Sequence, residues 1–228
     1  HNRMERSYHL SETRDLAEYI GHLRELNPDT PIIAVGFSLG GNVLLKWMGE
    51  TGDENPLTAA VAVSVPFDVN ESLRRFGKGL SRFYSKHLIS LMRKNLMDKY
   101  LDKPASFNLD KLKKADSFDE FDNAYTAPVH GFASAYDYHQ RSSSRLYLRH
   151  IKVPTLIIHA EDDPFMTPKA VPDDAELSSF VTLEVAEKGG HVGFVSGKWP
   201  WEARFWLNDR IESFLKLTVK TQKENENE

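Results

Sequence analysis

The run Gly36-Phe37-Ser38-Leu39-Gly40 places a serine midway between two glycines. This Gly-x-Ser-x-Gly spacing suits nucleophilic chemistry when it forms a sharp turn from a strand into a helix, because the serine Oγ then projects beyond the strand end. The small residues at positions 36 and 40 would let such a turn close without Cβ clashes. Ser38 is therefore the candidate nucleophile. The backbone N–H of Leu39, at the start of the expected helix, is the candidate oxyanion donor.

A serine hydroxyl is a weak nucleophile and needs a base that is itself oriented by a carboxylate. On a strand–turn–helix serine site these groups follow in the order Ser, Asp or Glu, His. His191 fits the base, because it comes last in this order and follows two glycines that permit a tight loop. Two aspartates compete for the orienting role. Asp163 is preferred because it directly precedes Pro164, and Asp162 is the alternative.

The elements that must position these residues alternate between short apolar runs and amphipathic stretches. Continuous apolar runs are typical of parallel strands that are covered on both faces. The pattern predicts an α/β fold, with a mostly parallel sheet and helices on both faces. Strands are expected over residues 32–35, 59–65, 154–159 and 181–185, and helices over 16–26, 42–49 and about 201–217.

Residues 67–150, called the cap below, interrupt this alternation. They contain no convincing strand pattern, and their apolar residues recur at helical spacing, which predicts a helical insertion. The α/β core would then comprise residues 1–66 and 151–219, and the charged tail 220–228 is expected to be disordered. Residues 68–150 hold 15 Lys/Arg and 10 Asp/Glu, whereas the rest of the chain holds 14 and 23. The excess of cations indicates either a solvated helical face or a peripheral contact with anionic lipid or an acidic substrate.

The composition of the chain excludes several kinds of site and gives no support for several kinds of partner. The absence of cysteine excludes disulfides, cysteine-rich zinc sites and a thiol nucleophile, and it fits a reducing, cytoplasmic location.

The net charge of −4 gives no reason to expect a nucleic-acid partner. No apolar run approaches the roughly 18 residues of a membrane span, and the polar N-terminus does not resemble a signal peptide. No metal-ligand constellation is present, so no cofactor is expected. The oligomeric state leaves no signature in the sequence.

Taken together, these motifs resemble the YheT-like branch of the α/β-hydrolases, which is related to ABHD-type acylglycerol and ethyl-ester hydrolases. The resemblance implies a hydrolase core with a helical cap, carboxylic esters of small molecules or lipids as substrates, and Ser38, Asp163 and His191 as the catalytic triad. It rests on Ser7-Tyr8-His9 with Glu12-Thr13, Val35-Gly36-Phe37-Ser38-Leu39-Gly40-Gly41-Asn42, Val65-Pro66-Phe67, Asp162-Asp163-Pro164-Phe165 and Gly189-Gly190-His191-Val192-Gly193-Phe194.

One feature departs from that family. Its members carry, before the point where this chain begins, the first strands of the sheet and a His-Gly loop that supplies a second oxyanion donor. We therefore expect this chain alone to be poorly active, since losing one such donor typically costs about 10²–10³ in rate. We also expect it to expose a sheet edge and to be prone to aggregation.

The three triad residues do not determine which molecule accepts the acyl group. A serine esterase or lipase-like hydrolase is the main hypothesis, and a thioesterase or an acyltransferase would use the same three residues. A catalytically idle fold that binds ligands or partners is a further alternative, although three residues in the required order argue against it.

Overall fold

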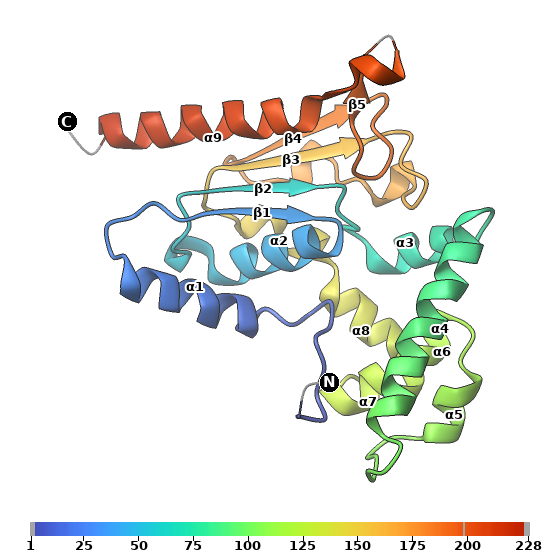
Figure 1. Cartoon of the computed structure of the whole chain (residues 1–228). Coiled ribbons are helices and arrows are strands. Elements are labelled where there is room, and N and C mark those ends of the chain that lie inside the picture. Colours follow the sequence, from blue (N-terminus) through green and yellow to red (C-terminus); the bar gives the residue numbers. More distant parts are fainter. Residues whose placement is uncertain (1–2, 198, 226–228) are drawn as a thin grey trace.

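The computed structural model describes residues 3–197 and 199–225 and contains a parallel four-stranded sheet (Figure 1). Its strands stand in the order β1, β2, β3, β4, so each strand neighbours the next along the sequence. All three pairings are parallel, with Ile33 opposite Ala59, Ala60 opposite Thr155 and Thr155 opposite Val181. The strands are β1 (Ile33–Phe37), β2 (Ala59–Val63), β3 (Thr155–Ala160) and β4 (Val181–Ala186). The predicted α/β fold with a mostly parallel sheet is confirmed.

Helices cover both faces of this sheet. On one face α1 and α2 pack against apolar side chains of β2 and β3, including Ala60, Ala62 and Ile157. On the other face α9 packs Leu207 against Val61, Val63 and neighbouring side chains. The core helices are α1 (Arg14–Leu26), α2 (Leu39–Thr51) and α9 (Trp206–Asn225), with short turns η1 (Gly52–Glu54), η4 (Pro168–Ala170), η5 (Asp174–Glu176) and η6 (Pro200–Glu202). The turn η3 (Ser144–His150) is the last element of the cap range and packs on α2. Among the described residues, no helix is both long and apolar enough to cross a bilayer.

Strand β1 is not buried on both faces, contrary to the prediction from its apolar run. Its side chains Ile33, Val35 and Phe37, which point away from α1 and α2, are 36–46% exposed. The physical reason is position. In the described part of the chain β1 pairs only with β2 and forms the edge of the sheet, and the apolar cluster under α9 draws on β2, β3 and β4 but not on β1. Among the described residues β1 is thus an edge strand with one unpaired side.

The cap consists of helices and helical turns joined by loops, and it connects the end of β2 to the start of β3 (Figure 1). Its own apolar cluster includes Leu96, Phe107, Leu112 and Tyr125, separate from the clusters on the sheet. Its elements are α3 (Val69–Phe76), α4 (Ser81–Lys99), α5 (Leu109–Lys114), α6 (Phe118–Phe121), the π-helical turn η2 (Asp122–Thr126), α7 (Ala127–His130) and α8 (Ala135–Ser142). Division of the chain into a core and a cap remains our interpretation of this arrangement.

The last helix differs from the prediction at both ends. It begins at Trp206, because residues 195–196 and 204–205 form the small antiparallel hairpin of β5 (Val195–Ser196) and β6 (Arg204–Phe205). It continues to Asn225, so residues 220–225 are helical where a disordered tail was predicted. Lys, Gln and Glu are good helix formers, and Lys220 and Glu224 form an ion pair one helical turn apart. Residues 226–228 of the predicted tail lie outside the described residues.

The segment before α1 fastens the cap to the core. It runs from the core helix α1 along the cap (Figure 1), and cap side chains bind its backbone. The hydrogen bonds are from Lys99 Nζ to Met4 O (2.6 Å), from Tyr125 Oη to Glu5 O (2.9 Å), from Ser7 N–H to His130 Nε2 (3.1 Å) and from Leu10 N–H to Tyr138 Oη (2.9 Å). The cap is thus attached to the core by this segment as well as by the two ends of the insertion.

His9 lies at the centre of this attachment and makes its stability depend on pH. Its ring packs 4.2 Å from that of His130 and 5.7 Å from that of Tyr138. Burial, and next the neighbouring His130, lower the pKa of His9 to about 4, although the Glu12 carboxylate opposes them. Between pH 6.5 and about 4 the unfolded chain therefore binds a proton that the folded protein does not, so the free energy of unfolding falls as pH falls through this window.

We expect His9→Phe to flatten the pH dependence of the melting temperature between pH 6.5 and about 4, because phenylalanine keeps the ring packing and does not titrate. Thermal unfolding followed by circular dichroism at several pH values measures this slope. His22, exposed on α1, provides the control His22→Gln, which should leave the slope unchanged. Equal slopes in His9→Phe and the unaltered protein would show that His9 does not carry the effect.

Candidate active site

Ser38 occupies a strained turn between β1 and α2. Its backbone angles are φ 49° and ψ −117°, in a region that residues with a Cβ seldom adopt. Two hydrogen bonds hold this conformation: Ser38 N–H donates to Val63 O of the neighbouring strand (2.8 Å), and Ser38 O accepts from Asn42 N–H (3.1 Å). Strain of this kind persists only where the surroundings impose it and is concentrated at functional sites. The strand, sharp turn and helix predicted around Ser38 are present.

The glycines that the turn requires are not the two predicted from the sequence, Gly36 and Gly40. A Cβ on Gly36 would lie 2.7 Å from Gly41 Cα, and a Cβ on Gly41 would lie 2.7 Å from a methyl carbon of Val65. A Cβ on Gly40, in contrast, would meet nothing within 4 Å. The close approach between strand and helix therefore requires Gly36 and Gly41, and the predicted steric need for a small residue at position 40 is wrong.

The backbone N–H of Leu39, the predicted oxyanion donor, lies directly after Ser38 at the start of α2. Leu39 is the first residue of α2, so its N–H has no carbonyl one turn earlier within the helix to bind. The aligned peptide dipoles of this 13-residue helix place partial positive charge at the same end. Both features suit stabilisation of negative charge developing next to Ser38.

The structure brings Ser38, His191 and Asp163 into one hydrogen-bonded chain. His191 Nε2 lies 2.9 Å from Ser38 Oγ, and its Nδ1 lies 2.8 Å from Asp163 Oδ2. Asp163 lies in the loop after β3 and His191 in the loop after β4. Both residues therefore lie at the carboxyl ends of the parallel strands, where β1 leads into Ser38. The Asp163 side chain is 1% exposed and that of His191 is 18% exposed. The carboxylate is therefore shielded from water while the imidazole remains open to a bound molecule.

Neighbouring groups fix the orientation of the Asp163 and His191 side chains. The free oxygen of Asp163, Oδ1, accepts the backbone N–H of Phe165 at 2.9 Å. The Phe165 ring packs edge-on against the His191 imidazole, with centroids 4.8 Å apart. Phe165 in turn contacts Phe76 of α3 and Tyr84 of α4. Two cap helices thus reach the surroundings of His191, a contact between distant segments that sequence spacing could not reveal.

Asp162, the alternative partner for His191, holds the His191 loop instead. Its Oδ1 accepts the backbone N–H groups of both Gly189 and Gly190 at 2.8 Å. These two bonds are the main reason that the pKa of Asp162 lies below its usual value. The paired aspartates therefore have separate tasks: Asp163 contacts the imidazole, and Asp162 positions the backbone that carries it. The adjacency of two aspartates was the only sequence signal for this second role.

Removing the Asp162 carboxylate, which accepts the Gly189 and Gly190 N–H groups, should misplace His191. We expect Asp162→Ala to lower kcat/KM by about 10²-fold, the loss that a displacement of about 1 Å from productive geometry can cause. The exposed neighbour Glu161 provides the control Glu161→Ala, for which no change is expected. Steady-state kinetics on an activated ester measure both. An unchanged kcat/KM in Asp162→Ala would contradict the positioning role.

A buried asparagine joins the site to the cap. Asn42, in the first turn of α2, is fully buried; its Nδ2 donates to Ser142 O (2.8 Å) and its Oδ1 accepts the N–H of Ser144 (3.0 Å). The helix that begins beside Ser38 is therefore tied to the end of α8 and the start of η3, in the last part of the cap. No role for Asn42 could be predicted from the sequence, because a single asparagine within an otherwise apolar helical pattern does not indicate its partners.

Comparison with known proteins gives one consistent result. Residues 3–198 match the family model described as alpha/beta hydrolase fold. The protein YheT of Escherichia coli (strain K12) is 39% identical over 94% of this chain and 63% of its own length. Phospholipase ABHD3 of Mus musculus is 31% identical over 94% of this chain and 52% of its own length. The predicted resemblance to YheT-like proteins is confirmed, and the chain spans roughly half to two thirds of these relatives.

A solved structure of an esterase from Pyrococcus furiosus has a similar fold. It matches with a TM-score of 0.52 and 17% identity over 90% of this chain and 62% of that one. At this identity the match supports the fold and does not extend to the chemistry.

Proposed function

This chain belongs to the α/β-hydrolase fold family, and on that premise we propose that it cleaves carboxylic esters through Ser38, His191 and Asp163. The observation that carries the proposal is the hydrogen-bonded chain of 2.9 Å and 2.8 Å contacts, which begins at a serine in strained backbone and ends at a shielded carboxylate. A nucleophile, a base and an orienting acid in this order form the general arrangement for acyl transfer to serine.

In the proposed acylation step, Ser38 Oγ attacks the carbonyl carbon of the ester while His191 Nε2 takes the hydroxyl proton. The carbonyl oxygen becomes an oxyanion, which the N–H of Leu39 stabilises with the help of the positive end of α2. The negative Asp163 stabilises the imidazolium and keeps its Nδ1–H directed toward the carboxylate. His191 then gives its proton to the departing alkoxide, which leaves as the alcohol.

Deacylation repeats these roles with water. His191 removes a proton from a water molecule, whose oxygen attacks the acyl carbon bound to Ser38. The C–O bond to Ser38 breaks, Oγ regains a proton from His191, and the carboxylic acid is released. The open face of the imidazole, at 18% exposure, gives water access to this position.

A panel of p-nitrophenyl esters of rising acyl length tests the proposal on the full chain. We expect release of p-nitrophenol that depends on acyl length, and the free acid as the second product. A thioesterase or an acyltransferase would be recognised by faster turnover of the matching acyl thioester, or by transfer of the acyl group to an added alcohol. Failure to turn over any acyl length, ester or thioester, would contradict the proposed function.

A further inference from the structure

The hairpin between β4 and α9 exposes a group of aromatic side chains. Trp199 and Trp201 stack with their rings 5.4 Å apart and nearly parallel, and they are 56% and 76% exposed. Phe205 of β6 adds a third exposed ring, at 59%. Figure 1 shows this hairpin projecting from the body of the protein beyond β5. An exposed cluster of large aromatic side chains requires an explanation, because contact with water does not stabilise an apolar surface.

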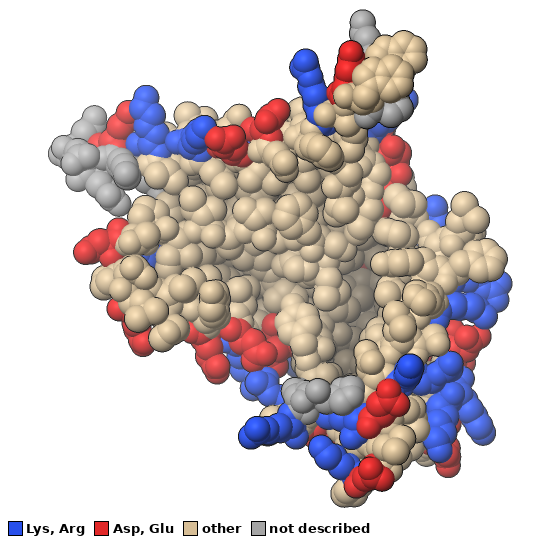
Figure 2. All heavy atoms as spheres, in the orientation of Figure 1, with Lys and Arg blue, Asp and Glu red and all other residues tan. Residues whose placement is uncertain are grey.

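The turn that joins α3 to α4 forms a second apolar projection. Leu80 is 87% exposed and Phe83 is 75% exposed, and further along α4 Leu91 and Met92 remain about two fifths exposed. The hairpin and this turn lie more than a hundred residues apart in the sequence. Both nevertheless stand on the side of the molecule toward which the four parallel strands point (Figure 1). Figure 2 shows uncharged atoms beside charged side chains at both prominences, with a hollow between them.

This side of the molecule also contains the candidate active site. Ser38 follows the end of β1, and His191 lies in the loop that leads from β4 into the hairpin. The cap projection connects directly to the site, because Tyr84, adjacent to Phe83, stacks on the Phe165 ring that contacts His191. The two projections therefore flank the approach to the triad.

Cations accompany the apolar side chains of the cap projection. Lys78 and Arg82 are exposed on either side of Leu80, and neither forms an ion pair within the described residues. The hairpin sequence holds Lys198, Glu202 and Arg204, a net charge of +1. An apolar surface edged by cations is complementary to a lipid surface of negative charge, and tryptophan favours the depth of the lipid headgroups.

We propose that the hairpin and the α3–α4 turn seat the protein on an anionic phospholipid bilayer, with the approach to Ser38 facing the lipid. Trp199, Trp201, Leu80 and Phe83 enter the headgroup layer, and Lys78 and Arg82 contact anionic headgroups. The proposal deepens the proposed function and rests on it in one respect: it gives bilayer lipid esters as the substrate class. Seating on the bilayer itself does not depend on catalysis.

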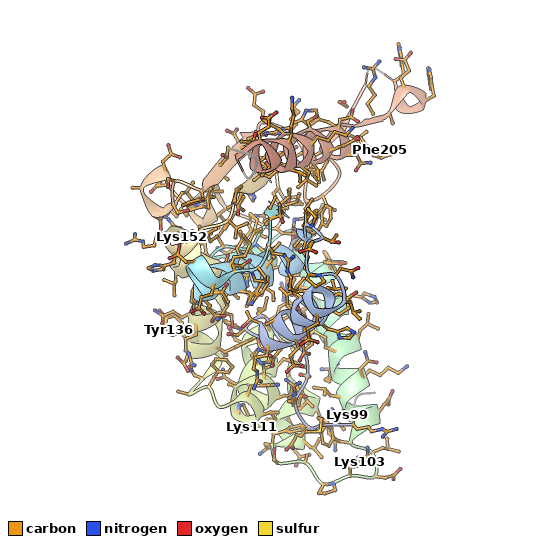
Figure 3. All side chains as sticks on the ribbon, turned by 90° about the vertical axis from the view of Figure 1, so that its left-hand side faces the viewer. Lys99, Lys103, Lys111, Tyr136, Lys152 and Phe205 are labelled. Atoms are coloured by element: carbon orange, nitrogen blue, oxygen red, sulfur yellow. The ribbon has the colours of Figure 1, made fainter. Side chains whose placement is uncertain are left out.

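The positive charge at the far end of the cap does not belong to this surface. Figure 3 places Lys99, Lys103 and Lys111 at the opposite end of the molecule from Phe205. Those lysines contribute to the basic character of the cap but would point away from a bilayer seated on the hairpin and the α3–α4 turn. Lys103 and Lys111 provide matched charge controls for Lys78 and Arg82.

Tryptophan fluorescence reads this contact directly. The chain has four tryptophans, of which Trp47 is buried in the core and Trp199, Trp201 and Trp206 lie in or beside the hairpin. The full chain carrying Ser38→Ala would be titrated with phosphatidylglycerol vesicles and with phosphatidylcholine vesicles, both containing a quencher-labelled lipid. We expect a blue shift and quenching with phosphatidylglycerol, and binding at least about tenfold weaker with phosphatidylcholine.

Variants assign the contact to the two projections. Flotation with phosphatidylglycerol vesicles should show binding lowered by at least about tenfold in Trp199→Ser/Trp201→Ser and in Leu80→Ser/Phe83→Ser. Each charge removed in Lys78→Gln/Arg82→Gln should cost about fivefold, which corresponds to ~1 kcal/mol per cation. The controls Lys103→Gln/Lys111→Gln and Leu217→Ser, which replaces an exposed leucine on α9, should bind as the parent does.

Binding that is unaffected by the hairpin and α3–α4 variants, or equal loss in the distal controls, would overturn the proposal. So would absence of binding to either vesicle, the result expected if the two projections meet another protein instead. Because binding is measured without turnover, loss of binding in a variant that still hydrolyses a water-soluble ester would leave the proposed hydrolysis intact. Normal binding without esterase activity in the Ser38-containing protein would refute only the hydrolysis.

Discussion

Replacing Ser38 with alanine is expected to lower the turnover of carboxylic esters by about 10⁶-fold, the loss seen when the nucleophile of a serine hydrolase is removed. The reason is direct: an alanine at this position offers no oxygen for the acyl carbon, and His191 Nε2 loses the group 2.9 Å away whose proton it accepts. Any residual rate would come from water attacking a bound ester beside the Leu39 N–H. Steady-state hydrolysis of the best p-nitrophenyl ester measures the effect.

Ser64 offers a matched control for this substitution. It also follows a strand of the sheet, has φ 52°, and is buried with a hydroxyl that has no hydrogen-bond partner in the described structure. Ser64→Ala should therefore retain activity, and both variants should retain the circular dichroism spectrum and melting temperature of the parent. Comparable turnover in Ser38→Ala and Ser64→Ala would remove Ser38 from the mechanism.

Replacing Asp163 with asparagine is expected to lower kcat by about 10⁴-fold with little change in the fold. An asparagine side chain presents an N–H where the carboxylate accepted one, so the imidazole reverses its tautomer and places a proton on Nε2. With Nε2 protonated, His191 cannot take the proton of Ser38. The lost negative charge also removes stabilisation of the imidazolium. Kinetics at saturating ester, together with thermal unfolding, separate this effect from damage to the fold.

The neighbouring aspartate discriminates between the two assignments. Asp162→Asn weakens the acceptor for the Gly189 and Gly190 N–H groups but leaves the contact between Asp163 and His191 in place. Its loss of activity should therefore be about a hundredfold smaller than that of Asp163→Asn. If Asp162→Asn were the more damaging variant, the orienting carboxylate would be Asp162, and the hydrogen bond from His191 to Asp163 would not be the one used in catalysis.

Much of the arrangement could be predicted from the sequence, because local patterns determine it. The apolar runs that became β2, β3 and β4 allow few alternatives to buried parallel strands, and the glycines around Ser38 mark a turn at the end of β1. The order of Ser38, Asp163 and His191 then follows from the topology, since parallel strands bring the loops at their carboxyl ends to the same edge.

Other features depended on contacts between distant residues, which spacing does not encode. An apolar run such as Ile33–Phe37 is the same whether its strand is covered on both faces or on one, so the run itself did not indicate that the face turned away from α1 and α2 is exposed. The need for a glycine at position 41 comes from Val65, about two dozen residues further along the chain. The distinct tasks of Asp162 and Asp163 became visible only once the His191 loop was placed beside them.

The central claim is that Ser38 is a nucleophile activated by His191. Labelling with a fluorophosphonate probe, followed by mass spectrometry of the modified peptide, tests this claim without knowledge of the natural ester. We predict one modified residue, Ser38, and loss of labelling in His191→Ala while the melting temperature is maintained. Labelling at a different serine, or undiminished labelling of Ser38 in His191→Ala, would contradict the claim.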